Sequence, residues 1–152
     1  MTRAELAAQS RSRLDDRFRE LGQKRQFAVP VRGWIQAIRE GLGMSTSQLA
    51  RRLGIKQPSV VALEQSEVKG TIELATLRRV AEALDCTVIY ALVPNKPLES
   101  MVRERARGVA RRRLAAIEHS MLLEDQAVSG KDLEARIEKL AGEIDPRLLW
   151  ED

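Results

Sequence analysis

Gln57, Ser59, Ala62 and Gln65 are spaced so that a helix would point all four side chains away from its apolar face. Each of these side chains is small or carries an amide. Glutamine can form two hydrogen bonds with adenine, and alanine can touch the methyl group of thymine. The four residues therefore suit a helix that lies in the major groove of DNA rather than a helix that is merely solvated.

Residues 45–66 carry the signals for two short helices joined by a tight turn. Ser45 is a good N-cap, and Gln48 follows it at the spacing of a capping box. Gly54 can adopt the left-handed conformation that ends the first helix, and Pro58 needs no amide hydrogen in the first turn of the second. The apolar residues predicted to face inward are Leu49, Ala50, Leu53, Ile55, Val60, Val61 and Leu63.

The pattern QLARRLGIKQPSVVALE, residues 48–64, closely resembles the helix-turn-helix of the phage-repressor family, which includes Cro and lambda repressor. This resemblance implies that the helix beginning at Gln57 is the recognition helix, with Thr46 and Lys56 near phosphate. The residues that it implies to face the bases are Gln57, Pro58, Ser59 and Ala62. An ordinary helical hairpin is the alternative, but it requires the small residues, the glycine turn and the apolar spacing to coincide by accident.

The chain departs from this pattern at residues 67–69, which are expected to lengthen the loop before Gly70. Thr71, where the helical pattern resumes, is a third candidate for a phosphate contact. Basic side chains elsewhere could extend such contacts, namely those of residues 11–25 and of residues 111–113. For both groups the alternative is a solvated basic face.

The composition favours a helical protein, because 32% of the 152 residues are charged and only 3% are aromatic. The net charge is +4, but residues 120–152 contain nine acidic and four basic side chains. A basic body suits a polyanion, so the acidic end is expected to serve something other than DNA. No run approaches the roughly 18 apolar residues of a membrane span, and the amino terminus has no apolar core of a signal peptide. A cytoplasmic location is expected.

Catalytic and cofactor-binding patterns are not found in this sequence. Cys86 is the single cysteine and His119 the single histidine, so a disulfide within the chain and a cysteine-cluster metal site are excluded. There is no glycine-rich phosphate loop. We therefore expect a protein that is not an enzyme and that carries no cofactor or metal.

The expected fold class is all-α, with a five-helix lambda-repressor-like domain that ends in a short β-strand. We predict a basic helical arm over residues 1–30, the helix-turn-helix domain over 31–95 and a helical extension over 96–152. The helical pattern predicts further helices at residues 2–21, 34–42, 71–84, 98–127 and 132–144. Leu148, Leu149 and Trp150 are expected to pack on the chain's own helices.

Residues 86–93, CTVIYALV, form a β-rich apolar run with no helical period. A single strand cannot satisfy its own backbone groups, and the chain offers it no partner. We therefore predict that it pairs with its copy from a second subunit, which gives a homodimer. A buried extended segment within one monomer is the alternative.

The whole chain resembles the bacterial family called mobile mystery protein A, through residues 33–50, 76–94 and 118–129. The resemblance implies a helix-turn-helix protein of mobile elements, encoded beside a Fic-domain protein in what looks like a toxin–antitoxin operon. Fic inhibitors resemble one another in a helix with a Ser or Thr and a Glu four residues later. Ser120 and Glu124 keep that separation, although Asp125 and Gln126 replace the Gly and Asn that follow.

These observations predict a sequence-specific DNA-binding transcriptional repressor that regulates an operon shared with a Fic-domain protein. The alternative is an antitoxin that binds and inhibits the partner Fic AMP-transferase through Ser120 and Glu124. A chance spacing of serine and glutamate within a helix core is the plain explanation of that pair.

Overall fold

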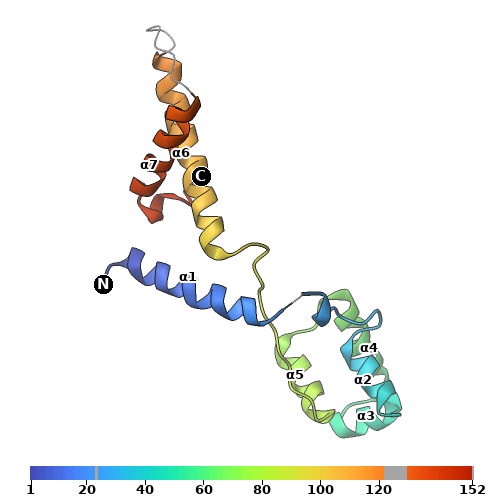
Figure 1. Cartoon of the computed structure of the whole chain (residues 1–152). Helices are drawn as coiled ribbons and strands as arrows, with labels where there is room; N and C mark the ends of the chain where they lie inside the picture. The colour runs from blue at the N-terminus through green and yellow to red at the C-terminus, as the bar shows by residue number, and fades with distance from the viewer. Residues whose placement is uncertain (23, 122–129, 152) are drawn as a thin grey trace. The chain divides into compact units, whose positions relative to one another are not determined.

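The structure is a computed structural model that describes residues 1–22, 24–121 and 130–151 (Figure 1). The chain divides into two compact units, one of residues Gln23–Leu92 and the other of Met1–Gly22 with Val93–Asp152. The helices are α1 (Arg3–Glu20), η1 (Lys24–Phe27), α2 (Trp34–Gly41), α3 (Thr46–Leu53), α4 (Gln57–Lys69), α5 (Leu74–Ala83), α6 (Leu98–Met121), α7 (Gly130–Glu143) and η3 (Pro146–Leu148). The all-α class is confirmed. None of the described helices is both long and apolar enough to cross a membrane.

The unit Gln23–Leu92 is built around α4, which packs against α2 and α3, and α3 also packs against α5. Its core consists of Ile35, Leu49, Ala50, Val60, Val80 and Leu84, all buried. The predicted inward residues of α3 and α4 are confirmed, since Leu53, Ile55 and Leu63 pack against this core and Val61 is half-buried. Trp34, at the start of α2, is 43% exposed, whereas its neighbour Ile35 is buried.

Two details of the predicted domain are wrong. Residues 31–95 contain four α-helices and not five, because the chain becomes extended after α5. Residues 67–69 do not lengthen a loop; they continue α4 to Lys69, and Gly70 caps the helix in the left-handed conformation. The additional residues bring Glu67 within the helix, where its side chain caps the amino terminus of α2.

The short strand expected at the end of this domain is also absent from the described single chain, where residues 86–92 are extended without pairing. The amide of Cys86 donates to the carbonyl of Ala81 at 2.8 Å. Beyond it, no hydrogen bond joins the backbone of residues 87–92 to another described residue. The β-rich composition therefore produces an extended segment, but a strand also requires a neighbour to receive its hydrogen bonds.

A buried ion pair joins α2 to α4. Arg39 Nε donates to Glu64 Oε1 at 2.6 Å and Arg39 Nη2 to Glu64 Oε2 at 3.3 Å, while Arg39 Nη1 donates to the carbonyl of Met44 at 2.9 Å. Arg39 is 8% exposed and Glu64 7%. The hydrogen bond with Glu64 holds the pKa of Arg39 above its usual value. The contact between Arg39 and Glu64 is therefore a charged pair held inside the unit.

Glu67 on α4 caps the amino terminus of α2. Its carboxylate accepts from the amide of Trp34 at 2.7 Å and from the amide of Ile35 at 2.9 Å. The N-cap residue, Gly33, is buried with φ 84° and ψ 165°, a backbone conformation that is open to glycine alone. A Cβ at Gly33 would lie 2.7 Å from Glu67 Oε2. Gly33 therefore allows α4 to reach the start of α2.

The second unit packs α6 against α7 and against α1. Its buried core is Ala106, Val109, Ala110, Ile137, Ile144 and Leu149. The expected packing of the carboxyl-terminal end is confirmed for Leu149, which is 3% exposed and whose carbonyl accepts from Arg105 Nε at 2.5 Å. Leu148 and Trp150 are 39% and 61% exposed, and the Arg105 guanidinium lies 5.7 Å from the Trp150 ring centre. Arg107 joins the helices by ion pairs with Glu134 at 2.9 Å and Glu138 at 3.0 Å.

Helix α1 joins this unit through polar contacts. The carboxylate of Asp15 accepts from the amide of Leu98 at 2.7 Å and from that of Glu99 at 3.1 Å, which caps the first turn of α6. Arg11 pairs with Glu99 at 3.0 Å. No residue of α1 is buried, and its apolar residues Leu6 and Leu14 are 52% and 38% exposed.

The ion pair between Arg39 and Glu64 can be tested by substitution. Glu64→Ala should lower the free energy of unfolding by about 3–5 kcal/mol, because it leaves a buried guanidinium without its counter-charge. The double variant Arg39→Met, Glu64→Leu should recover most of this loss, because no charge then remains buried. Urea unfolding followed by circular dichroism measures both. A loss below about 1 kcal/mol in the single variant would contradict the burial described here.

Gly33→Ala should also destabilise the protein. The backbone strain costs about 1–3 kcal/mol, and the loss should be larger still because the new methyl group displaces Glu67. Gly70→Ala is the matched control, since Gly70 also has a positive φ of 71° but nothing lies within 4 Å of the Cβ position. Its cost should be that of a left-handed alanine, roughly 1–2 kcal/mol. Equal losses in the two variants would show that the Glu67 cap contributes nothing.

Candidate nucleic-acid interface

Local signals position the two helices of the motif as expected. Ser45 and Gln48 form a reciprocal capping box at the start of α3, with distances of 2.8 and 3.2 Å. Gly54 ends α3 in the left-handed conformation, with φ 67° and ψ 29°. Pro58 lies in the first turn of α4. The tight turn between α3 and α4 thus follows from Gly54 and Pro58, which end the first helix and begin the second.

The residues expected to face bases lie on the accessible side of α4. Gln57, Pro58, Ser59 and Ala62 are all exposed. Gln57 Nε2 donates to Thr46 Oγ1 at 3.0 Å, so the first residues of α3 and α4 are joined across the turn. Lys56, the exposed N-cap residue of α4, directly precedes Gln57. The structure therefore brings Thr46, Lys56 and Gln57 together at one end of α4.

Thr71 lies at the other end of α4. The helix has 13 residues, so about 20 Å separate its two ends. The Thr71 hydroxyl donates to the carbonyl of Ser66 at 3.3 Å, and the side chain is exposed. Thr71 thus does not join the Thr46 and Gln57 cluster, and a phosphate contact from it would fall on a different part of a bound duplex.

The charge on this face is positive because both carboxylates of α4 are engaged elsewhere. Between residues 46 and 69 the only acidic residues are Glu64 and Glu67. Glu64 is buried against Arg39, and Glu67 caps α2. The exposed surface of α3 and α4 therefore carries mainly basic and neutral side chains, and the half-buried carboxylate of Glu67 is directed at the start of α2, which favours a polyanionic ligand.

Two arginines of α3 were not among the predicted contacts. Arg51 and Arg52 are exposed, and Arg52 Nη1 donates to the carbonyl of Ala83 at 3.0 Å, at the end of α5. This contact gives Arg52 a structural role within the unit. The two consecutive arginines in the motif are the sequence signal for these contacts. Their pattern does not indicate which of the two contacts another helix of the same unit.

The predicted inhibitory pair lies at the limit of the described structure. Ser120 belongs to the last turn of α6, and nothing is described of its side chain. Glu124 lies outside the described residues. In the part of the chain that is described, no group of three or more His, Cys, Asp or Glu side chains could hold a metal ion.

Comparison with known families gives a clear result for this unit. Residues 35–90 match the helix-turn-helix family model. The match extends from α2 through α5 to the extended segment, and it supports a DNA-binding regulator of the XRE type. The helix-turn-helix family is a family of DNA-binding regulatory domains and not an enzyme family. Comparison with curated proteins and with solved structures gives no match for the chain.

Proposed function

We propose that the protein is a sequence-specific transcriptional repressor that reads its operator with α4. The observation that carries this proposal is the exposed end of α4, where Gln57 is held by Thr46 and no carboxylate faces the ligand. Basic residues supply non-specific attraction to phosphate, and the amide and small side chains supply base discrimination. Such a regulator acts where its DNA is, so we also propose a cytoplasmic location.

The hydrogen bond that Gln57 donates to Thr46 suits Gln57 for contact with adenine. A glutamine amide has two donor hydrogens and one acceptor oxygen. One hydrogen of Nε2 bonds to Thr46 Oγ1, so the second hydrogen and Oε1 remain available for N7 and the N6 amino group of adenine. Thr46 would thus act as a positioning residue, because it restricts the rotamers of Gln57 before DNA binds.

The finer parts of the proposal concern assembly and genetic context. We propose that the repressor acts as a homodimer, because helix-turn-helix proteins of this kind bind two half-sites related by a two-fold axis. We further propose that it regulates an operon shared with a Fic-domain protein. The resemblance of residues 33–50, 76–94 and 118–129 to mobile mystery protein A supports this context.

A second candidate function is inhibition of the Fic partner. The acidic composition of residues 120–152 supports it, since nine acidic side chains are unsuited to DNA. The spacing of Ser120 and Glu124 would place both on one face of a helix. In this proposal Glu124 would pair with an arginine of the Fic site, and DNA binding by α4 would serve regulation only.

Gln57→Ala should relax sequence choice more than it weakens non-specific binding. A duplex is first selected from a random-sequence library, and affinities for it and for random duplexes are then measured by fluorescence anisotropy. The discrimination between them should fall by about 1–3 kcal/mol, because a bidentate base contact is lost. Thr46→Val should produce a smaller fall in the same direction, and Gln9→Ala on α1 is the control that should produce none. Equal losses on both duplexes would mean that Gln57 is not a base reader.

Affinity for the selected duplex should fall steeply as salt is raised. Each neutralised phosphate contributes about −0.9 to the slope of log affinity against log salt concentration. Lys56→Ala should reduce the steepness by about 0.9, while leaving the preferred sequence unchanged. Lys131→Ala in α7 is the matched control and should keep the wild-type slope. An unchanged slope in the Lys56 variant would remove Lys56 from the phosphate contacts.

Glu124→Gly tests the inhibitory proposal. Purified protein is added to the neighbouring Fic protein, and transfer of AMP from ATP to a target hydroxyl is followed. Wild-type protein should suppress the transfer, and the variant should suppress it at least tenfold less. Glu138→Gly, in α7, is the control for a lost carboxylate. Undiminished suppression by the Glu124 variant would exclude this residue as the inhibitory group.

A further inference from the structure

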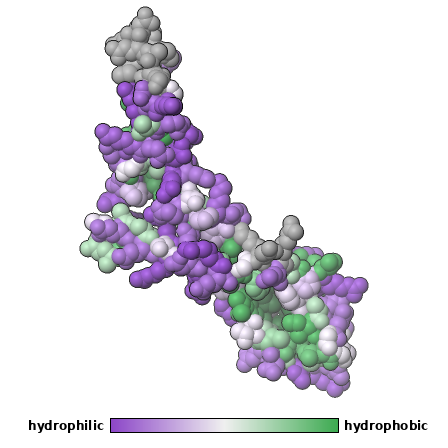
Figure 2. All heavy atoms as spheres, viewed as in Figure 1, coloured by the Kyte–Doolittle hydropathy of each residue, from purple (hydrophilic) through white to green (hydrophobic). Residues whose placement is uncertain are grey.

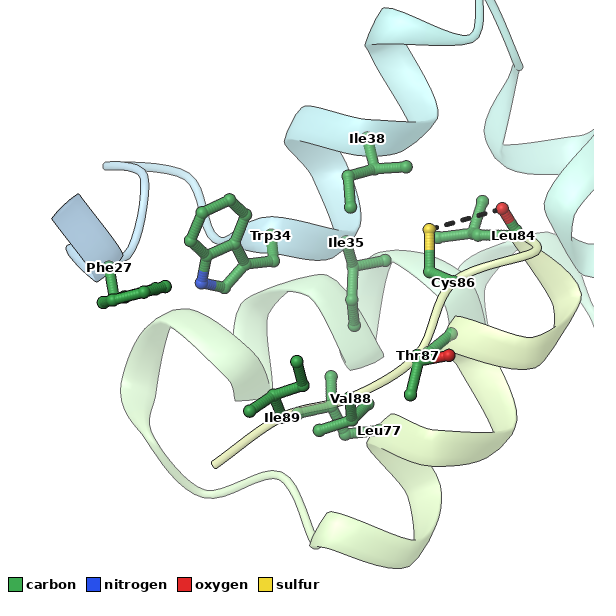
Figure 3. Close-up of a pocket in the computed structure, with 11 residues that line it drawn as sticks. Phe27, Trp34, Ile35, Ile38, Leu77, Leu84, Cys86, Thr87, Val88 and Ile89 are labelled. Carbon is green, nitrogen blue, oxygen red and sulfur yellow. Dashed lines mark hydrogen bonds between the residues drawn. The ribbon is translucent and has the colours of Figure 1, made fainter. Parts of the chain in front are cut away.

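An apolar hollow of about 480 Å³ opens on the unit Gln23–Leu92, between α2, α5 and the extended segment 86–92 (Figure 3). Trp34 and Ile35 stand on one side of it, with Val88 and Ile89 on the facing side. Phe27 lies beyond Trp34 and is 64% exposed. No charged side chain lines the hollow. Its occupant should therefore be apolar and neutral.

The extended segment that borders the hollow has an exposed apolar surface of its own. Ile89 and Leu92 are each 90% exposed and Tyr90 is 64% exposed. Figure 2 shows such apolar side chains gathered on this unit, whereas hydrophilic residues cover most of the visible face of the other unit. The backbone of residues 87–92 makes no hydrogen bond to another described residue. An extended apolar edge of this kind is a template for pairing with another strand.

We propose that a second copy of this chain covers the hollow. The segments 87–92 of two copies would pair as antiparallel strands about a two-fold axis, and apolar side chains of each segment would fill the hollow of the other copy. The inference deepens the proposed homodimeric repressor by naming its interface. In this dimer Trp34, which is 43% exposed in the single chain, would become buried.

The properties of the segment favour its own copy over other occupants. Residues 86–93 carry no charge, so the pairing of two identical segments brings no like charges from the segments themselves together. The guanidinium of Arg78 on α5 lies 5.8 Å from the Tyr90 ring centre. An antiparallel pair is self-complementary, because the two-fold axis makes each strand the partner of the other. One contact would thus satisfy the backbone groups of both segments and cover both hollows. A small apolar ligand in the hollow would leave the edge and Leu92 exposed.

The first experiment measures mass and tryptophan emission together, without DNA, on the full chain. Trp150→Phe leaves Trp34 as the single tryptophan. Sedimentation should give a dimer, and dilution should shift Trp34 emission to the red in step with dissociation. Ile89→Lys should raise the dimer dissociation constant by at least about 100-fold, since each copy would bring a charged side chain into the apolar interface. Val68→Lys, at an exposed apolar residue of α4, is the control and should leave the dimer intact.

The second experiment determines how the segments pair. Single cysteines are placed at each position from 87 to 92 in a Cys86→Ser background, and disulfide-linked dimers are counted after oxidation. Antiparallel strands bring only the residue at the two-fold axis within disulfide distance of its copy, so cross-linking should peak at one position and fall on both sides. Equal cross-linking at all six positions would indicate parallel strands and overturn the proposal.

Three further outcomes would overturn the proposed dimer interface. They are a monomeric wild-type protein, a dimer that survives Ile89→Lys, and Trp34 emission that does not change as the mass changes. Circular dichroism shows whether each variant retains its helices. The proposal that the protein is a repressor fails separately. A dimer that selects no duplex would refute the repressor alone, whereas a monomer that still selects a half-site would refute the homodimer and this interface but not the reading of DNA by α4.

Discussion

The helix-turn-helix unit depends on the inward engagement of both carboxylates of α4. Glu64 neutralises the buried Arg39, and Glu67 supplies the acceptor that the first amides of α2 require. Each contact joins α2 to the helix proposed to read DNA, so the orientation of α4 is set from its inner face. The same two contacts direct both carboxylates of α4 away from its outer face. Structural stability and attraction to a polyanion thus come from one arrangement of two glutamates.

Much of this unit could be predicted from local signals. Ser45, Gln48, Gly54 and Pro58 act within one or two turns of their own helices, and the structure has them where the capping rules put them. The inward residues of α3 and α4 followed from helical spacing alone. The residues proposed to face bases are exposed, as the sequence indicated, although their part in binding stays a prediction.

The contacts that escaped prediction join residues far apart in the sequence. Arg39 and Glu64 are 25 residues apart, and no local pattern states which charge a buried arginine will meet. The sequence signal for the burial of Arg39 is its position among the apolar residues of a short helix. The departure from the family pattern at residues 67–69 predicts a loop, whereas α4 continues through them and so brings Glu67 to the start of α2. The β-rich composition of residues 86–92 predicts a strand, but pairing depends on a partner that one chain does not contain.

The unit formed by Met1–Gly22 and Val93–Asp152 is discontinuous in sequence, and this affects the order in which the chain can fold on the ribosome. Asp15 caps α6 through Leu98, whose amide lies 83 residues further along. At about 5–20 residues per second, roughly 4–17 s pass between the synthesis of these two partners. The helix-turn-helix unit is complete within that interval and can fold first. Helix α1 can dock on α6 only after α6 has been synthesised, so its side chains stay without that neighbour in the meantime.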